Sequence, residues 1–407
     1  MSTLLDSVTQ SRNAVYEMSC DSQVKKQVVV EGYELIDPAV LDVLPSVAAV
    51  LSVTDVAESA WAKAKRIDVR TVDGDEESYF MKVSIGFHGR EALKGEFEAT
   101  SAIHTINPTF CPKPIAWGTL ELQEDSHFYL CRFYEFVKDE PDVIDRQSFV
   151  EQLAKLHQSD TSPQGKFGFH CTTYNGNLPQ DNSWCDSWEE FFSKGLRHVL
   201  KVREERAGPC VELNELLPDL FDKVIPRLLR PLETNGRKLK PSLVHGDLWC
   251  GNVGVIDGDT GQAIVFDPSS FWAHNEYELG NWRPKRNGFD EEFFNAYHDF
   301  IPRSEPVADY DDRNALYALR FNLHAAALFP NDPSYLEMAI NEIRRLNEKF
   351  KKGSRKVHVT SDRDSLREAQ SPMYNNQPRT SSKGYHIPAT IPAETSMTPL
   401  RNYRCAQ

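Results

Sequence analysis

The sequence contains no apolar segment long enough to cross a lipid bilayer. Its longest uncharged apolar stretch, residues 43–54, has twelve residues and includes Pro45, whereas a transmembrane helix needs about 20 apolar residues. The first residues also lack the basic region followed by an apolar stretch that marks a secretory signal. We therefore expect a cytoplasmic protein with no membrane partner.

Paired cysteines and positive charge are also scarce. The eight cysteines are scattered between Cys20 and Cys405 without a CxxC pair, which is typical of reduced thiols rather than of a disulfide framework. Lys and Arg number 46 against 60 Asp and Glu, which gives a net charge of −14. We expect no nucleic-acid partner, because a nucleic-acid backbone requires clustered basic residues. A nucleotide is not excluded, since a local basic group with Mg²⁺ can hold phosphates on an acidic protein.

The 407 residues are enough for two packed lobes, and the composition divides the chain into four parts. Residues 1–30 are polar and weakly patterned, which predicts a flexible segment. Residues 31–136 predict strands around one long helix, and residues 137–352 are mostly helical. Residues 353–407 are rich in Ser, Thr, Pro, Asn and Gln, which predicts a disordered tail. We therefore predict an α+β fold with a small β-rich first lobe and a larger helical second lobe.

The apolar spacing predicts the individual elements. A helix end or a strand is expected at residues 47–53. The expected strands lie at 61–72, 78–84, 115–120, 127–133, 243–247 and 263–267, the last preceded by a hairpin turn at 258–261. The expected helices lie at 94–105, 149–157, 188–206, 213–229, 290–299, 309–328 and 334–352.

The most informative stretch, residues 243–255, reads LVHGDLWCGNVGV. It has Asp247 five residues before Asn252, and Asp267 follows at the end of the apolar strand 263–266. Phosphoryl transfer needs a carboxylate to orient the attacking hydroxyl, and an amide and a second carboxylate to hold Mg²⁺; the protein-kinase catalytic loop has the same five-residue separation. The alternative is a turn, because Gly246 and its neighbouring glycines would also suit polar residues that cap a strand.

A lysine for the phosphates is expected upstream. Lys82 lies within an apolar strand, and Glu96 and Glu98 lie on the helix that follows. A kinase uses such a lysine to contact the α- and β-phosphates, and a helix carboxylate to hold it. We favour Glu96 over Glu98 as the carboxylate; the alternative for Lys82 is an edge-strand lysine that faces solvent.

A glycine-rich phosphate loop is missing. No glycine occurs between Ser52 and Asp68. Ser52, Thr54, Ser59 and backbone amides are therefore the candidates to support the phosphates.

Three motifs resemble the fructosamine/ketosamine-3-kinase family (protein-ribulosamine 3-kinase-like), within the wider aminoglycoside- and choline-kinase-like group. The run from His245 to Asn252, HGDLWCGN, matches the family's HGDLWxGN. Residues 175–192, NGNLPQDNSWCDSWEEFF, resemble its PQ.N.W..DW..FF signature, and residues 266–279, FDPSSFWAHNEYEL, resemble its FDP..F..H.E.EL segment. The resemblance extends from about residue 45 to residue 350.

The resemblance implies a protein-kinase-like two-lobed fold and ATP- and Mg²⁺-dependent phosphorylation of a sugar hydroxyl of ketosamines, on glycated amines or proteins. It implies that Asp247 is the catalytic base and that Asn252 and Asp267 bind the metal. It also implies that Lys82 and Glu96 serve the nucleotide phosphates. The adenine would bind at the connection between the lobes, at Arg132, Phe133, Tyr134 and Glu135.

One segment departs from the family pattern. Residues 280–289, GNWRPKRNGF, are polar and basic where the family is usually apolar. Two alternatives therefore stay open, which are a kinase of the same fold for another hydroxylated small molecule and a nucleotide-binding pseudokinase. The three cations of this segment, Arg283, Lys285 and Arg286, belong either to an anionic acceptor site or to a solvated loop.

Several other residues have two interpretations. Trp184 and Trp188 are expected in the core rather than as sugar-stacking platforms. His245 is expected to hold its loop by hydrogen bonds. His274 and Glu276 fit an acceptor contact and a structural hydrogen bond equally well.

Overall fold

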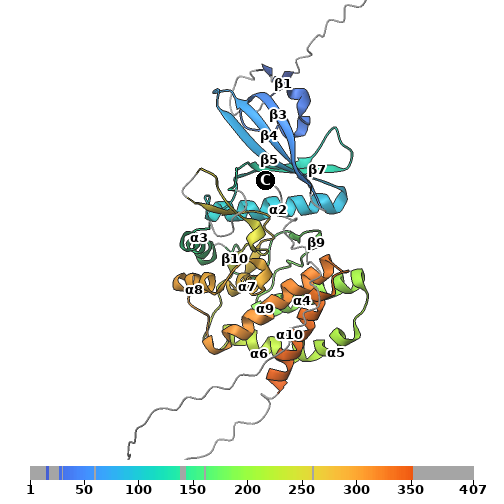
Figure 1. Cartoon of the computed structure of the whole chain (residues 1–407), viewed down its shortest axis with the longest axis vertical. Coiled ribbons are helices and arrows are strands. Elements are labelled where there is room, and N and C mark those ends of the chain that lie inside the picture. Colours follow the sequence, from blue (N-terminus) through green and yellow to red (C-terminus); the bar gives the residue numbers. More distant parts are fainter. Residues whose placement is uncertain are drawn as a thin grey trace, which may run out of the picture.

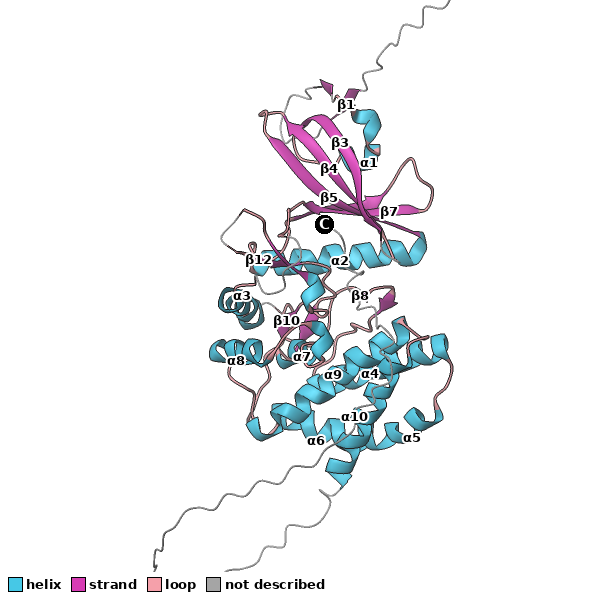
Figure 2. Ribbon diagram, in the orientation of Figure 1, coloured by secondary structure: helices cyan, strands magenta, loops and turns pink. Residues whose placement is uncertain are grey.

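The computed structural model describes residues 15–17, 27–29, 31–58, 61–137, 144–159, 162–258 and 261–351. It consists of an antiparallel sheet with one long helix, stacked on a mostly helical part (Figures 1 and 2). The α+β, two-lobed prediction is therefore confirmed. The predicted tail at 353–407 and most of the predicted segment 1–30 lie outside the described residues; a short pair, β1 (Val15–Glu17) and β2 (Gln27–Val29), comes from the latter.

The first lobe is built on a five-stranded antiparallel sheet with the order β3-β4-β5-β7-β6. The strands are β3 (Val47–Glu58), β4 (Lys63–Thr71), β5 (Glu76–Ile85), β6 (Pro114–Thr119) and β7 (Ser126–Arg132). One face packs on α1 (Pro38–Leu41) and the turn η1 (Tyr33–Leu35). The other face packs on α2 (Gly86–Ile106).

The pleat of β5 decides where Lys82 points. Tyr79, Met81 and Val83 join the core beneath α1, whereas Phe80 joins the cluster beneath α2. Successive strand residues alternate between faces, so Lys82 lies on the α2 side with Phe80. This places its ammonium toward the second lobe rather than toward solvent, which excludes the edge-strand alternative.

Helix α2 begins eight residues before the predicted start at residue 94. Gly86 and Gly89 concealed this start, because glycine is a poor helix former. The structure explains Gly89, since a Cβ atom there would lie 2.5 Å from the Ser84 hydroxyl oxygen. The helix therefore follows β5 directly and packs closely against the end of that strand.

The second lobe packs helices around α9, whose residues are nearly all buried. Trp188 is fully buried in the centre of this core and donates its indole N–H to Tyr317 at 2.9 Å, and Trp184 packs against the same core. The core prediction for both is confirmed. The helices are α3 (Arg146–Gln158), α4 (Trp188–Ala207), α5 (Val211–Asp219), α6 (Ile225–Leu229), α7 (Glu276–Gly280), α8 (Glu291–Phe300), α9 (Tyr310–Leu328) and α10 (Pro333–Lys351).

Short antiparallel pairs and short helices complete the second lobe. The pairs are β8 (Tyr174–Asn175) with β9 (Leu178–Pro179), β10 (Ser242–Val244) with β13 (Phe271–Ala273), and β11 (Val253–Val255) with β12 (Ala263–Val265). The short helices are the π-helix η3 (Leu220–Val224) and the 3₁₀ helices η4 (Arg230–Glu233), η5 (Cys250–Asn252), η6 (Lys285–Asn287) and η7 (Val307–Asp309).

The lobes contact each other at several places, among them the chain connection and helix α2. The chain crosses between them after β7, where the Val137 N–H donates to Val255 at 2.9 Å. Helix α2 touches the second lobe at Gly95, where a Cβ atom would lie 2.5 Å from the Thr172 carbonyl oxygen. Among the described helices, none has the length and apolarity that a membrane crossing requires.

Candidate active site

The loop after β10 carries Asp247, and a buried carboxylate fixes its backbone. Glu278 on α7 is fully buried and accepts the backbone N–H groups of His245 and Gly246, the latter at 3.0 Å. Two buried N–H donors that converge on one carboxylate form strong hydrogen bonds. The family-like segment at 266–279 therefore contributes a positioning residue, Glu278, which the sequence interpretation did not identify.

His245 holds the same loop from the other side. Its Nδ1 accepts the Asp247 N–H at 3.3 Å, so its Nε2 carries the proton and donates to the Phe266 carbonyl at 2.9 Å. Burial lowers the pKa of His245, which keeps the ring neutral. The predicted structural role of His245 is confirmed, and it links the Asp247 loop to the strand that ends at Asp267.

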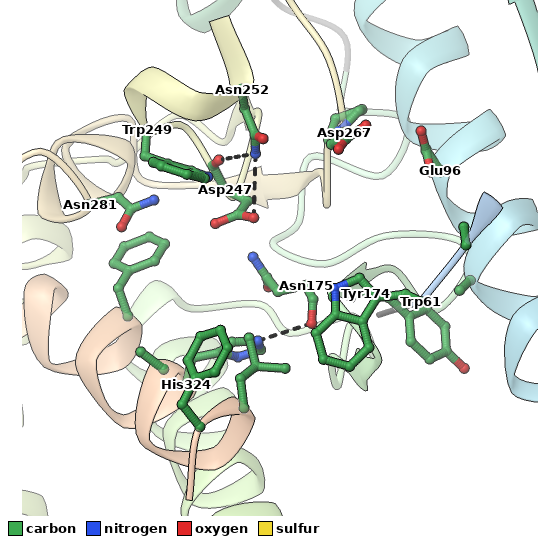
Figure 3. Close-up of a pocket in the computed structure, with 18 of the residues that line it drawn as sticks. Trp61, Glu96, Tyr174, Asn175, Asp247, Trp249, Asn252, Asp267, Asn281 and His324 are labelled. Carbon is green, nitrogen blue, oxygen red and sulfur yellow. Dashed lines mark hydrogen bonds between the residues drawn. The ribbon is translucent and has the colours of Figure 1, made fainter. Parts of the chain in front are cut away.

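Asp247 lies at the floor of the site between two amides (Figure 3). The Asn252 amide Nδ2 donates to the Asp247 carbonyl at 2.8 Å and lies 3.4 Å from its carboxylate. Burial raises the pKa of Asp247 to about 8, and the nearby carboxylates of Asp267 and Glu278 add to this. Hydrogen bonds from Asn175 and Asn252 act against it. A carboxyl group poised near neutral pH is suited to accept a proton.

Lys82 links the two lobes. Its Nζ atom lies 2.7 Å from Glu96 on α2 and also forms an ion pair with Asp267. Glu98 lies on another face of α2 and contacts His170 at 3.0 Å, so Glu96 is the carboxylate that pairs with Lys82. Asp267 has a φ of 58°, in the left-handed region that Asp adopts more readily than most residues.

One pocket between the lobes brings these side chains together. Lys82, Glu96, Asp247, Asn252 and Asp267 all line it, and its volume is about 270 Å³. Figure 3 shows Asp247, Asn252 and Asp267 on one side of it. Residues that the sequence interpretation did not single out complete the wall: Trp61, Tyr174, Asn175, Trp249, Asn281, Phe321, His324, Leu328, Phe329 and Tyr335. Asn175 and Trp249 lie within the quoted motifs and Asn281 lies in the quoted segment 280–289, which could have identified them, whereas no signal in the sequence indicated the others.

The turn between β3 and β4 occupies the position at which a kinase would have its glycine-rich loop. Trp61 from this turn lines the pocket, and its ring lies close to Gly176 of the second lobe. Ser52 does not face the pocket, because its hydroxyl donates to Asp68 at 2.7 Å. Ser59 lies outside the described residues. A tryptophan, rather than glycines, thus covers the pocket at this edge.

The predicted adenine residues lie at the connection between the lobes. Arg132 pairs with Glu77 at 3.0 Å, and the Arg66 guanidinium lies 4.6 Å above the Phe133 ring and pairs with Glu135. These residues, like Tyr134, are outside the lining of the pocket that holds Asp247.

His274 and Glu276, for which the sequence left two interpretations open, have structural roles. His274 and Glu276 are fully buried; His274 bonds to Tyr317 at 2.8 Å, and Glu276 pairs with Arg313 at 3.0 Å. Neither lines the pocket. The structural interpretation therefore holds for both.

The donor set fits a magnesium ion. Asn252 commits its Nδ2 to Asp247, which leaves the amide oxygen as the ligand atom, and Asp267 supplies a carboxylate in the same pocket. Mg²⁺ prefers hard oxygen ligands and is usually bound by one or two carboxylates plus substrate phosphates rather than by a full protein cage. Among the described residues, no group of three or more His, Cys, Asp or Glu side chains could hold a metal ion.

The close packing of Gly246 gives a first testable prediction. Gly246 has a φ of 85°, and a Cβ atom there would lie 2.5 Å from the Ser269 carbonyl oxygen; Gly258 has a φ of 78° with nothing within 4 Å. Gly258→Ala should cost about 1–2 kcal/mol of unfolding free energy through backbone strain alone. Gly246→Ala should cost roughly 1–3 kcal/mol more, through the clash. Urea denaturation measures both, and equal losses would contradict the close approach.

Comparison with known proteins identifies the family. A family model described as fructosamine kinase matches residues 51–349. The chloroplastic protein-ribulosamine 3-kinase of Oryza sativa subsp. japonica is 31% identical over 260 residues, 63% of this chain and 69% of that protein. The ketosamine-3-kinase of Mus musculus is 31% identical over 268 residues, 61% of this chain and 82% of that protein.

Solved structures share the fold. A crystal structure of a Thermobifida fusca protein assigned to the fructosamine-3-kinases aligns with a TM-score of 0.59 at 21% identity, over 74% of this chain and 94% of that chain. The family resemblance predicted from the motifs is confirmed. Because the family match spans both lobes and every motif around the pocket, the chain belongs to the fructosamine kinase family of phosphotransferases that act on a hydroxyl group.

Proposed function

We propose that this protein transfers the γ-phosphoryl group of ATP to a sugar hydroxyl of a ketosamine, a fructosamine or ribulosamine adduct on an amine. The observation that carries the proposal is the composition of the pocket that contains Asp247. Part of its lining is the charged set of Lys82, Asp247 and Asp267, and residues of α9 and α10 add an aromatic and polar wall. The relatives named ribulosamine and ketosamine 3-kinases supply the substrate class.

The charged end suits the nucleotide. In the proposal Lys82, held by Glu96, binds the α- and β-phosphates, and residues 132–135 hold the adenine. The oxygens of Asn252 and Asp267 hold Mg²⁺, which neutralises charge on the phosphates as the phosphoryl group is transferred.

Asp247 acts on the acceptor. The proposal assigns it to the proton of the attacking hydroxyl, because its carboxylate lies in the pocket and its pKa is raised toward neutral pH. The amides of Asn175 and Asn252 donate to Asp247 and thereby fix its orientation. Trp61, at the turn between β3 and β4, restricts the access of water to this point.

The site suits a small-molecule acceptor better than a hydroxyl side chain of a protein substrate, because it lacks features of a protein kinase. Leu248 and Trp249 stand in the catalytic loop where protein kinases have polar residues. Pro268 follows Asp267 at once, and no Ala-Pro-Glu sequence occurs after it. A glycated lysine on a protein surface is compatible with the pocket only as a protruding side chain.

The test is incubation with ATP, Mg²⁺ and either fructosyl-lysine or ribulosyl-lysine, followed by phosphorus NMR. We expect a new sugar-phosphate resonance that is absent with lysine or free fructose and absent without the protein. No phosphorylated ketosamine, together with phosphorylation of an aminoglycoside or another hydroxylated metabolite, would contradict the proposal. That result would favour the second candidate, for which the polar segment 280–289 is the supporting observation.

The proposed setting is the cytoplasm. Cys111 and Cys131 are buried free thiols, which is typical of a reducing compartment. The rice relative is named as chloroplastic.

A further inference from the structure

The departing segment 280–289 contains three cations with different surroundings. Arg283 pairs with Asp311 at 2.7 Å and contacts Asn314, and Lys285 is exposed. Arg286 alone of the three lines the pocket that contains Asp247. The solvated-loop interpretation therefore fits Lys285, and Arg286 needs a separate explanation.

The backbone of this segment is folded so that Arg286 reaches the pocket. The Asn287 amide donates to the Asn281 carbonyl and lies 2.9 Å from its side-chain oxygen, which closes the segment on itself. Asn281 also lines the pocket, and Figure 3 shows it beside Trp249 and Asp247. The loop thus presents Arg286 and Asn281 to one cavity.

The Arg286 guanidinium has neutral partners. It donates to the Asn322 amide oxygen at 2.6 Å, lies 3.6 Å from the Met338 sulfur and stands 5.0 Å above the Tyr335 ring. No ion pair joins Arg286 to a carboxylate among the described residues; the nearby Asp332 carboxylate accepts the Ser334 N–H instead. Partial burial lowers the pKa of Arg286, yet a guanidinium keeps its charge. Arg286 interacts with the Asp332 carboxylate through charge but forms no direct ion pair with it. An anion that a ligand brings into direct contact would therefore stabilise this partly desolvated cation further.

The carboxylates that line the pocket and the cation Arg286 lie on different parts of its wall. Its lining carboxylates are Glu96, Asp247 and Asp267, and Lys82 is paired with two of these. The lining cation that remains in the described part of the chain is Arg286, on the wall formed with α9 and α10. His324 on that wall is neutral, because burial and the neighbouring Arg320 lower its pKa.

We propose that Arg286 binds a carboxylate on the amine portion of the acceptor, so that the preferred substrate is a small glycated amino acid with a free carboxylate. This inference rests on the proposed ketosamine kinase function. The sugar hydroxyl must lie at Asp247, which leaves the amine substituent to extend along the wall. A carboxylate is favoured over a phosphate because one planar guanidinium matches a single carboxylate, whereas a phosphate usually gathers several donors.

The experiment compares matched acceptors with and without the charge. We would measure kcat/KM at saturating ATP for ε-fructosyl-lysine and its α-carboxamide, and for fructosyl-glycine and fructosyl-glycinamide. The wild-type protein should prefer at least one carboxylate over its amide by about 10- to 100-fold, the range of a hydrogen bond to a charged group. In Arg286→Gln this ratio should fall to within about threefold of one.

Two variants provide controls. Lys285→Gln removes the adjacent exposed cation and should keep the wild-type ratio, which excludes a general effect of net charge. Arg286→Lys keeps the charge without the planar fork and should give an intermediate ratio; it also serves if Arg286→Gln fails to fold. A wild-type ratio near one, or a ratio that Arg286→Gln leaves unchanged, would overturn the inference.

Two further measurements distinguish a failure of this inference from a failure of the proposed kinase function. A further acceptor is a fructosamine with a neutral amine portion and a phosphate on its sugar. If kcat/KM for this acceptor depends on Arg286 and kcat/KM for the carboxylate-bearing acceptors does not, the carboxylate assignment is overturned. If no ketosamine is turned over, calorimetry of the same acceptors with Mg·ADP decides. If Arg286→Gln weakens the binding of the carboxylates, the anion site at Arg286 is supported although the kinase proposal is contradicted. If Arg286→Gln leaves this binding unchanged, the anion site is overturned as well.

Discussion

Replacing Asp247 by Asn should lower kcat by roughly 10²–10⁴-fold while the Kd for Mg·ATP changes by less than about threefold. The substitution keeps the size of the side chain and its hydrogen bonds, because an amide oxygen can still accept from Asn175 and Asn252. It removes only the group that can take a proton from the acceptor hydroxyl. The loss should therefore appear in the chemical step and not in nucleotide affinity.

The measurement combines steady-state kinetics with calorimetric titration of Mg·ATP. Asp222→Asn is a suitable control, since Asp222 is exposed on η3 in the second lobe, and it should leave both quantities unchanged. Turnover near the wild-type rate in purified Asp247→Asn would remove Asp247 from the proposed mechanism. A large loss of Mg·ATP affinity would instead assign Asp247 to nucleotide binding.

Replacing Asp267 by Ala should weaken Mg·ATP binding and abolish turnover together. Asp267 supplies a carboxylate to the pocket and pairs with Lys82, so its loss would remove the proposed metal ligand and one of the two carboxylate partners of Lys82. A metal-held transition-state charge accounts for several kcal/mol, which corresponds to more than about 10³-fold in kcat/KM. In contrast to Asp247→Asn, the defect should already be present in calorimetry with nucleotide alone.

Backbone strain has to be separated from ligand loss at Asp267, because its φ is 58°. Asp125 has a φ of 51° and an exposed side chain on the turn before β7, so Asp125→Ala should show the strain of alanine in this conformation without loss of activity. Asp267→Asn, which tolerates the conformation, should show the metal defect with less loss of stability. Normal Mg·ATP binding by Asp267→Ala would mean that Asp267 is not the metal ligand.

Most of the secondary structure could be predicted from the sequence because its signals are local. The strands around Lys82 and the helix with Glu96 follow from apolar periodicity and turn residues, and the structure has them as β5 and α2. The predicted start of α2 was wrong because helix propensity, which depends only on residue type, disfavours Gly89. The need for glycine there comes from a contact with Ser84, which local propensity does not contain.

The charged end of the pocket was likewise encoded in short motifs. Asp247 and Asn252 lie on one loop and Asp267 follows one strand later, so a spacing of a few residues already predicts their proximity. Which helix carboxylate pairs with Lys82 was narrowed by sequence to Glu96 or Glu98. The rotation of α2 decides it, because Glu96 faces the pocket and Glu98 faces His170.

The sequence by itself determined the fold class, the family and the side chains proposed for phosphoryl transfer. Only the tertiary structure placed Asn281, Arg286 and His324 in the pocket of Asp247, since these residues lie far from Asp247 in the chain and are brought to it by the packing of the second lobe. It also separated Arg286 from Arg283 and Lys285, three cations that look equivalent in sequence. The physical reason is that a charge is defined by its neighbours. Asp311 of α9 pairs with Arg283, and Lys285 is exposed to solvent. Arg286 packs over the Tyr335 ring and is partly desolvated beside the pocket.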